Sequence, residues 1–503
     1  MSGVDPEFLS LPLESLRSAA LERARTLGCS DAELRVERIR SQMVALRDAK
    51  VETTVDDVEL GMGLRVVHDG VIGFASTVEL HPDAAGQLAE QATALARAVS
   101  AAVNRRVELA PEPPYGDVQW VSDYEIDPTT VALSDKVVPL ETWSAQLLCS
   151  EGVDHVTATV LAVSEDKQYA DLAGTVATQR RVRVHPQLEI LSVDEHTGGF
   201  ETMRTIAPPV ARGWEYLEGR GGWNAEAELA ELPELLAAKV VAPSVEAGSY
   251  DLIIDPTNLW LTIHESVGHA TELDRALGYE AAYAGTSFAT IDGLGSLRYG
   301  SDIMNVTGDR VTPNGLATVG YDDEGVAAQE FDIVREGLLV GYQLDRRMAA
   351  ENGLGRSNGC AFADSPLHVP IQRMANVSLR PASGEGPTTE ELISSTDLGI
   401  YIVGDKSWSI DMQRHNFQFT GQRFFLIEKG RIKGQVKDVA YQARTTDFWG
   451  SLDALGGTST YRLGGAFNCG KGQPGQVAPV SHGCPSARFS QVNVLNTRAE
   501  AGR

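Results

Sequence analysis

The residues best suited to chemistry in this chain are concentrated in the stretch HESVGHATELDR, which runs from His264 to Arg275. Neutral imidazole is a good zinc ligand, and a glutamate that does not bind the metal can take a proton from zinc-bound water, whose pKa the metal lowers to about 7. His264, Glu265 and His269 supply these residue types. The stretch therefore predicts a zinc site in which His264 and His269 bind the metal and Glu265 acts as general base.

The spacing of the two histidines is unusual for such a site. In the familiar HExxH arrangement the histidines lie four residues apart on one helix face, whereas His264 and His269 are five apart. At about 100° per residue, five residues separate the imidazoles by roughly 140° on a regular helix. We predict a single π-type turn that brings His269 back over His264, with Gly268 lowering the steric cost of the distortion. The bare pattern can also arise by chance on an amphipathic helix, so it needs support from elsewhere in the chain.

A helix with a clear start should carry these residues. Asp255 can cap it and Pro256 suits its first position, where a missing N–H costs nothing. Apolar residues then recur at helical spacing and should face a core; they are Leu259, Ile263, Val267 and Ala270. The segment YDLIID just before this helix is typical of a short buried strand. The candidate site therefore lies at the start of a helix that follows a strand.

The strand YDLIIDP followed by HESVGHATELDR resembles the TldD/PmbA family of metalloproteases, whose catalytic members carry HExxxH on a helix at the start of a β-rich C-terminal domain. Other segments resemble the family as well, so the likeness runs over most of the chain; they are GLRVVHDGVIGFAST, IQRMANVSLRPASG, YIVGDKSWSID and FFLIEKGRIKGQVKDVAY. AFNCGKGQPGQ resembles the family's cysteine-bearing CGK segment. The resemblance implies that Cys469 is the third zinc ligand and that one position stays open for water.

The chemistry of Cys469 agrees with that role, because thiolate binds zinc well and three protein ligands plus water is the catalytic pattern. Nearby glycines would let the backbone approach closely; they are Gly464, Gly465, Gly470 and Gly472. Lys471 would favour the thiolate electrostatically. Without the resemblance, Cys469 would be interpreted as a small buried side chain.

Several neighbouring residues leave alternatives open. His482 and Cys484, in SHGCPSARF, fit residues behind the ligands, a substitute ligand or, as the favoured interpretation, a structural turn. Glu272 and Asp274 follow the second histidine where many family members have an acidic-glycine step. They fit carboxylates that orient a ligand histidine, but solvated charges at an exposed helix end are the favoured interpretation. The departure bears on substrate preference more than on chemistry.

Three further residues could belong to a substrate cleft. His415 could donate to a transition-state oxyanion, and Trp408 and Trp449 could line the cleft. Aromatic residues in a β-rich domain usually pack in the core or at its rim, and a single histidine usually forms hydrogen bonds with nearby groups. We therefore assign none of the three a role.

Charge and composition restrict the class of protein. The 43 basic and 69 acidic residues give a net charge of −26, which disfavours binding to nucleic acid or to anionic lipid surfaces. We find no run of eighteen apolar residues and no signal-peptide pattern, so we expect no membrane association. The five scattered cysteines do not form a disulfide framework and favour the reducing cytoplasm.

The segment patterns predict an α+β protein. Helical and alternating segments predict an N-terminal mixed α/β domain with antiparallel sheets over residues 1–235, and a partial repeat of this order indicates an internal duplication. Residues 236–503 are expected to form a mostly β domain carrying the HExxxH helix. The Gly-rich turn, helix and Pro-containing segment between Gly219 and Gly248 would connect the two, with the boundary near Leu235.

Together these observations predict a zinc-dependent metalloprotease that hydrolyses unfolded or extended peptides, including modified peptide precursors. An extended peptide could add a strand to a sheet edge. The resemblance implies a dimer, formed with a TldE/PmbA-like homologue that lacks the motif, in which this chain is the catalytic partner. One alternative is a non-catalytic scaffold or regulatory subunit whose structural metal has a fourth ligand, His482 or Cys484. A second is a dipeptidyl-peptidase-like HExxxH enzyme whose third ligand is a carboxylate.

Overall fold

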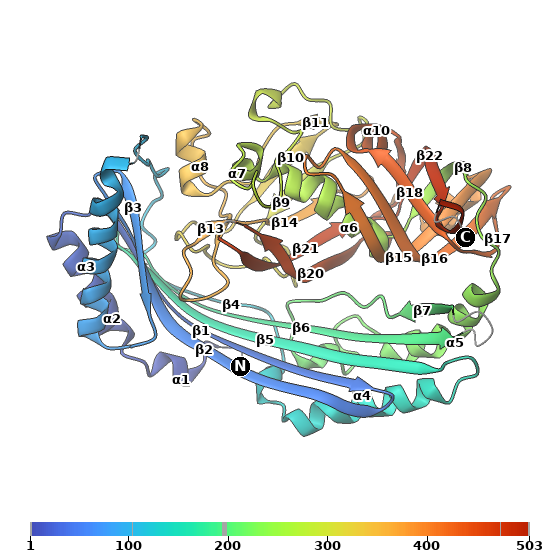
Figure 1. The fold of residues 1–503 in the computed structure, drawn as a ribbon, viewed down its shortest axis with the longest axis horizontal. Coiled ribbons are helices and arrows are strands. Elements are labelled where there is room, and N and C mark those ends of the chain that lie inside the picture. The colour runs from blue at the N-terminus through green and yellow to red at the C-terminus, as the bar shows by residue number, and fades with distance from the viewer. Residues whose placement is uncertain (1–2, 103, 194–198, 473, 501–503) are drawn as a thin grey trace.

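The first part of the protein is built on one long, curved and mostly antiparallel sheet (Figure 1). The computed structural model describes residues 3–102, 104–193, 199–472 and 474–500. The strand order is β3-β2-β1-β5-β6-β4, with β7 also paired to β6. The strands are β1 (Asp31–Arg47), β2 (Lys50–His68), β3 (Val71–Thr77), β4 (Asp117–Val121), β5 (His155–Asp171), β6 (Val176–Val193) and β7 (Phe200–Arg204). Asp48 and Ala49 both adopt positive φ between β1 and β2, as a tight hairpin turn requires.

Helices cover this sheet at its two ends. The helices are α1 (Pro6–Leu9), α2 (Leu13–Thr26), α3 (Pro82–Val99), α4 (Leu133–Leu148) and α5 (Ala225–Val241). The order helix, two long strands, short strand, helix occurs twice, first from α2 to α3 and then from α4 to α5. The arrangement of elements therefore repeats as the sequence pattern indicated, while a common origin of the two halves stays a prediction.

The second part is dominated by a sheet that closes on itself, because β15 pairs with both β8 and β16 along the path β15-β8-β22-β18-β16. Its strands are β8 (Gly248–Ile254), β15 (Leu398–Ile410), β16 (Asn416–Glu428), β17 (Arg431–Val436), β18 (Val439–Arg444), β19 (Leu452–Leu455) and β22 (Ala487–Asn496). The segment FFLIEKGRIKGQVKDV forms a hairpin from the end of β16 and from β17.

Smaller sheets and short helices complete this part. The four-stranded sheet contains β9 (Val306–Asp309), β10 (Glu330–Arg335), β11 (Leu338–Leu339) and β14 (Asn376–Leu379), and the two pairs are β12 (Ala361–Phe362) with β13 (Ile371–Gln372) and β20 (Arg462–Lys471) with β21 (Gln476–Cys484). The helices are α6 (Pro256–Ile263), α7 (Leu273–Ala276), α8 (Arg346–Glu351), α9 (Thr389–Ser394), α10 (Thr445–Gly450) and α11 (Thr497–Glu500). Helices are the minority, and the predicted α+β class with a β-rich C-terminal part is confirmed.

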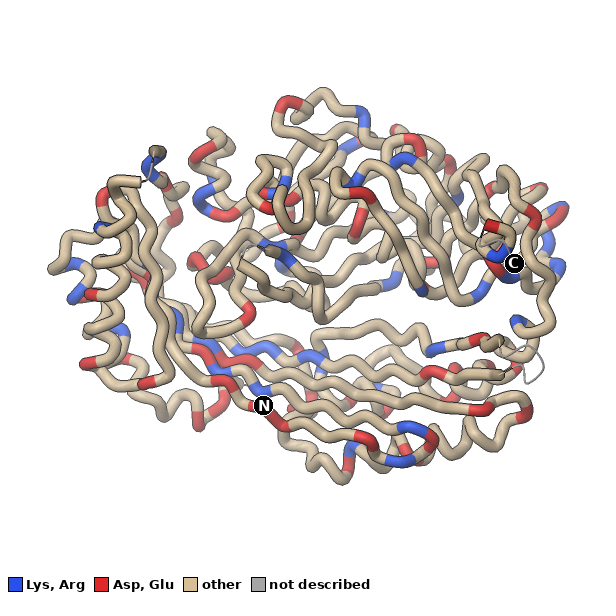
Figure 2. The backbone as a smooth tube through the Cα atoms, in the orientation of Figure 1, with Lys and Arg blue, Asp and Glu red and all other residues tan. Residues whose placement is uncertain are grey.

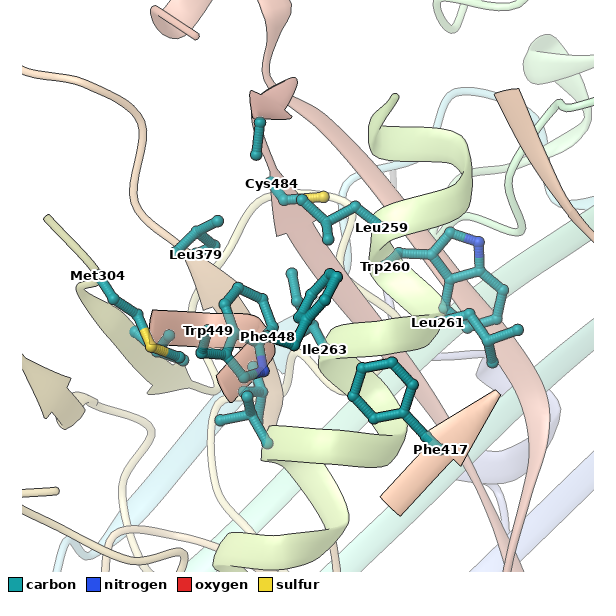
Figure 3. Packing of buried hydrophobic residues seen from close by; sticks show 14 of the residues in the cluster. Leu259, Trp260, Leu261, Ile263, Met304, Leu379, Phe417, Phe448, Trp449 and Cys484 are labelled. Carbon is teal, nitrogen blue, oxygen red and sulfur yellow. The ribbon is translucent and has the colours of Figure 1, made fainter. Parts of the chain in front are cut away.

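Helix α6 runs through the core of the second part. Asp255 caps it by accepting a hydrogen bond from the Thr257 amide, and Pro256 occupies the first turn, as predicted. Leu259 and Ile263 are fully buried in the same apolar cluster as Phe417, Phe448 and Trp449 (Figure 3). Surrounding packing therefore holds the end of α6, where the candidate site begins.

The predicted boundary at Leu235 falls inside α5. Two leucines of this helix, Leu232 and Leu236, belong to the core beneath the first sheet. The division into two domains stays a prediction, and a boundary between Val241 and Gly248 would leave α5 whole. No helix of the described residues is both long and apolar enough to cross a membrane.

A layer of buried charged residues joins the two parts. Asp323, on a loop of the second part, contacts Arg35 of β1 at 2.9 Å and Lys167 of β5 at 2.7 Å. Its neighbour Glu324 pairs with Arg65 of β2 at 2.5 Å. Figure 2 shows blue and red segments side by side along these strands. The second part is therefore attached to the sheet by buried ion pairs.

Candidate metal centre

The helix that carries the two histidines changes its winding at the predicted place. After α6 the chain forms a π-helical turn over His264–Gly268, and the amide of His269 donates to the carbonyl of His264, five residues earlier. The rings of His264 and His269 lie 4.7 Å apart between centroids. The predicted π-type turn is confirmed, and it brings both imidazoles to one side of the helix.

Gly268 serves this turn for a different reason from the one expected. Its backbone angles, φ −53° and ψ −63°, are ordinary for a right-handed helix and need no glycine. A Cβ at this position, however, would lie 2.6 Å from the sulfur of Met374. Close packing against Met374, and not backbone freedom, therefore favours glycine at position 268.

Cys469 reaches the histidines from β20, about two hundred residues away in sequence. Its Sγ lies 3.6 Å from Nε2 of His269, and one ligand atom each of His264, His269 and Cys469 lie within 4.8 Å of one another. β20 can lie so close to α6 because Gly464 has no side chain: a Cβ there would lie 2.3 Å from Trp260. The structure thus gathers the three residues expected to bind the metal.

Hydrogen bonds assign the tautomer of His264. The carbonyl of Val377 can only accept, so Nδ1 of His482, 2.8 Å away, donates to it. Burial, with the neighbouring His264, lowers the pKa of His482 well below its usual value, so Nε2 of His482 is an acceptor. It lies 2.8 Å from Nδ1 of His264, which must donate. Nε2 of His264 therefore keeps a lone pair for a metal.

Glu272 acts in the same way on His269. Its carboxylate accepts a hydrogen bond from Nδ1 of His269 at 2.8 Å. Nε2 of that ring therefore keeps a lone pair that can bind a metal. Glu272 is fully buried and also contacts Lys471 and Arg275. Burial alone would raise its pKa, but Lys471 and His269 hold the pKa of Glu272 well below its usual value.

Two interpretations of these neighbouring residues were wrong. Glu272 and Asp274 are buried, not solvated, because the chain folds over them, and Lys471 pairs with them at 3.1 and 2.8 Å. His482 and Cys484 lie within strand β21, not in a turn. His482 is the residue behind a ligand, whereas Sγ of Cys484 points to the carbonyl of Pro256 at 3.7 Å.

The thiol of Cys469 is biased towards thiolate, though not by Lys471. Burial alone would raise its pKa, but the adjacent His269 ring and the charge of Arg373 lower the pKa of Cys469 below its usual value. Lys471 instead forms ion pairs with Glu272 and Asp274. The predicted pairing of Lys471 with the thiolate is thus replaced by a pairing with carboxylates.

Glu265 faces a cation that the sequence did not single out. Its Oε2 accepts a hydrogen bond from Arg414 at 2.7 Å. The adjacent His415 stacks on Phe288, with the ring centroids 5.3 Å apart, and is not among the residues that line the cleft. The usable signal for Arg414 was its position beside the histidine that we considered as an oxyanion donor.

One cleft of about 800 Å³ is lined by His264, Glu265, His269, Cys469 and Arg414. One wall comes from β5 and β6 of the first sheet, a second from residues 204–209, and a third from β20. Trp408 lines it and is 52% exposed, whereas Trp449 is buried and donates to the hydroxyl of Ser266. The volume suits a ligand of several residues.

The donor set fits zinc. Two neutral imidazoles and a thiolate are ligands that zinc prefers, and a tetrahedral zinc ion separates a nitrogen from a sulfur ligand by about 3.5 Å. The observed distance from Nε2 of His269 to Sγ of Cys469 is 3.6 Å. Among the described residues, these three side chains form the only cluster of three or more His, Cys, Asp or Glu side chains close enough to share a metal.

Comparison with known proteins decides the family. Residues 247–496 match the family model described as PmbA/TldA metallopeptidase C-terminal domain, and residues 32–103 match PmbA/TldA metallopeptidase domain 1. The chain belongs to the PmbA/TldD family. This membership confirms the resemblance noted in the sequence.

Curated relatives of the family carry metalloprotease names. A metalloprotease from Methanothermobacter thermautotrophicus is 26% identical over 474 residues, covering 93% of this chain and 95% of the relative. A metalloprotease TldD homolog from Haemophilus influenzae is 23% identical over 480 residues, 93% of each chain. A zinc metalloprotease TldD homolog from Saccharolobus solfataricus is 24% identical over 267 residues, 53% of this chain and 56% of the relative.

Solved structures share the fold. A protein of Thermotoga maritima described as a modulator of DNA gyrase superposes with a TM-score of 0.75 at 15% identity, covering 96% of this chain and all of the other. TldE from Thermococcus kodakarensis superposes with a TM-score of 0.69 at 16% identity, covering 95% and 99%.

Proposed function

We propose that this chain is the catalytic subunit of a zinc-dependent metalloprotease that hydrolyses unfolded or extended peptides. The observation that carries the proposal is the convergence of His264, His269 and Cys469 beside Glu265 in one open cleft. Metalloprotease names among relatives across most of the chain support the same class of activity. Modified peptide precursors belong to this substrate class.

Zinc held by His264, His269 and Cys469 would supply Lewis acidity, lowering the pKa of a water molecule and polarising the scissile carbonyl. Glu265 removes a proton from the attacking water and later gives it to the leaving amine. His482 and Glu272 keep the two imidazoles in the tautomer that leaves each Nε2 unprotonated.

The edge of β20 supports an extended substrate. Among the described strands, β20 pairs only with β21, and its residues 463–470 line the cleft. A peptide that added a strand there would be bound through backbone hydrogen bonds with little dependence on its sequence. Trp408 and Phe467 line the same cleft and offer apolar surface to side chains.

We further propose that this chain works as a dimer with a TldE/PmbA-like homologue that lacks the His–Glu motif. A solved TldE with the same fold supports a partner of similar shape. We place the protein in the cytoplasm, because each of its five cysteines is a free thiol. Co-purification with such a homologue, followed by mass measurement in solution, tests the pairing.

Glu265→Gln and Cys469→Ala test the catalytic proposal, with Cys484→Ala as a matched buried-cysteine control. We expect Glu265→Gln to retain zinc and lose peptide cleavage, and Cys469→Ala to lose zinc. Unchanged cleavage by Glu265→Gln would refute the assigned base, whereas zinc-loaded wild type that cleaves no peptide would favour a non-catalytic subunit with a structural metal. Full zinc content in Cys469→Ala would favour the enzyme with a carboxylate third ligand.

A further inference from the structure

We infer that Arg414 is a catalytic residue: its guanidinium binds the carbonyl oxygen of the substrate as that oxygen gains negative charge. The inference rests on the proposed function, since it adds a second residue to the same reaction. It follows from where Arg414 is held, from what its donors contact and from how charge moves between it and Glu265.

Arg414 lies in the cleft beside the general base. One terminal nitrogen donates to Oε2 of Glu265 at 2.7 Å, and the other donates weakly to the carbonyl of Ala284 at 3.4 Å. Its Nε is buried and has no hydrogen-bond partner in the described parts of the chain. The guanidinium therefore has donors to spare at the edge of the site, where it lines the cleft together with His264 and Cys469.

The loop that presents Arg414 is held in an unfavourable conformation. Arg414 has a φ of +61°, which a residue with a side chain rarely adopts. Asp411 fixes the turn by accepting from the amides of Gln413, His415 and Asn416. The hydroxyl of Thr445 donates to the carbonyl of Arg414 at 2.7 Å. Backbone strain of this kind persists only where the surroundings enforce it, and it is concentrated at functional sites.

A second segment braces the same loop. The amides of Thr286 and Phe288 donate to the carbonyls of Met412 and Gln413. Gly285, at φ +89°, lets the two segments meet, because a Cβ there would lie 2.0 Å from the carbonyl oxygen of Met412. The position of Arg414 is therefore fixed from both sides before any substrate binds.

Other basic groups of the cleft are less suited to this role. Arg204 lines the cleft, but its guanidinium is paired with the carboxylate of Asp405 and also donates to the backbone carbonyl of Asp405. His185 lies on the opposite wall, and burial, with the charge of Arg204, lowers its pKa to about 4, so it is neutral. Of the described residues that line the cleft, Arg414 is thus the cation in contact with Glu265.

Arg414 can follow the charge that the reaction moves. When the water oxygen adds to the carbonyl carbon, one water proton goes to Glu265 and the π electrons of the carbonyl go to its oxygen. Glu265 becomes neutral and binds Arg414 less strongly, while the carbonyl oxygen beside them becomes an anion. When the C–N bond then breaks, the electrons on the oxygen re-form the carbonyl and the leaving amine takes the proton from Glu265. Arg414 then pairs again with the carboxylate of Glu265. A preorganised cation beside such an oxyanion stabilises it strongly.

The inference can be tested with Arg414→Gln and Arg414→Gly, using Arg444→Gln as the matched control. Glycine suits a φ of +61°, so Arg414→Gly removes the side chain without adding strain. Arg444 is exposed on β18 nearby and is not among the residues that line the cleft. We expect kcat/KM for Arg414→Gln to fall roughly 10²- to 10³-fold, as on removal of one oxyanion donor. Added guanidinium should partly restore Arg414→Gly.

Binding of a phosphinic peptide to the zinc-loaded protein separates this role from mere positioning of Glu265. Its tetrahedral anion imitates the transition state, so calorimetry should show its affinity for Arg414→Gln falling about as much as kcat/KM. Binding of an uncleaved peptide to Glu265→Gln and to Glu265→Gln with Arg414→Gln should be nearly equal. If the phosphinic peptide binds Arg414→Gln as tightly as it binds wild type, the inference is wrong, whether or not cleavage is slower. Failure of the proposed function would look different, since zinc-loaded wild type would itself cleave no peptide.

Discussion

At the scale of single residues, the site depends on the groups behind the proposed ligands. Each imidazole uses Nδ1 for an internal hydrogen bond, His264 with His482 and His269 with Glu272. These bonds fix the ring orientation and the tautomer before a metal arrives, so the two rings lose less conformational freedom when the metal binds. The two supports differ in kind, because one is a neutral ring and the other a carboxylate.

Replacing His482 should weaken zinc binding without removing a ligand. His482→Leu cannot accept from Nδ1 of His264, so we expect zinc affinity to fall about 10- to 100-fold in a chelator competition. His482→Gln still offers an acceptor to His264 and a donor to Val377, so its loss should be smaller. Equal zinc affinity in His482→Leu and wild type would show that the hydrogen bond from His264 to His482 does not support the metal site.

At the scale of elements, one extra residue in the helix makes the site possible. The π-helical turn over His264–Gly268 places a histidine at each of its ends on the same side. The turn is held from outside: Ser266 donates to the carbonyl of Thr262 and accepts from Trp449, and Tyr299 donates to the carbonyl of Ser266. Packing and side-chain hydrogen bonds therefore support a winding that is rare by itself.

Gly268→Ala tests whether packing or backbone freedom requires the glycine. The added methyl would meet the sulfur of Met374 at 2.6 Å, so we expect a loss of about 1–3 kcal/mol in the free energy of unfolding and weaker zinc binding. If packing is the cause, Gly268→Ala should cost much less when Met374 is already alanine. A double-mutant cycle of the free energies of unfolding in denaturant measures this coupling. Strict additivity would show that the cost of Gly268→Ala comes from the backbone and not from contact with Met374.

At the scale of the whole molecule, buried charges hold the first sheet against the second part and so define the cleft. Glu37 on β1 is part of this layer and is fully buried. It faces Arg35 of its own strand at 3.6 Å, Lys167 of β5 at 3.1 Å, and the negative charges of Glu165 and Asp323. Burial raises the pKa of Glu37 to about 7, with Lys167 opposing the rise and Glu165 adding to it.

This raised pKa predicts a pH dependence of stability. The folded protein binds the Glu37 proton more tightly than the unfolded chain, so the stabilisation is complete below about pH 4.5 and is lost as pH rises through about 7. The Glu37→Gln variant has no ionisable group at this position. Between pH 4.5 and pH 8 its free energy of unfolding should therefore fall by about 2–3 kcal/mol less than that of wild type. Unfolding in denaturant across that range measures it. Glu52→Gln, at an exposed position of β2, should leave the profile unchanged, and the same slope in Glu37→Gln and wild type would contradict the prediction.

The sequence by itself determined the local features of the site. The cap at Asp255, the strand before it and the apolar period of α6 placed His264, Glu265 and His269 on a helix end. The five-residue spacing was enough to predict the π turn, because helix geometry is a local property. Resemblance to a family, and not spacing, pointed to Cys469, since no local rule links a strand residue to a helix two hundred positions away.

Only the tertiary structure decided which charged and polar residues support the site. Glu272 was expected in solvent and lies buried against Lys471, because whether a carboxylate is solvated depends on the segment that folds over it. His482 and Arg414 reach His264 and Glu265 from strands and turns more than a hundred residues away. Burial and long-range pairing depend on how segments meet in space, and that information is not carried by the spacing of residues along one segment.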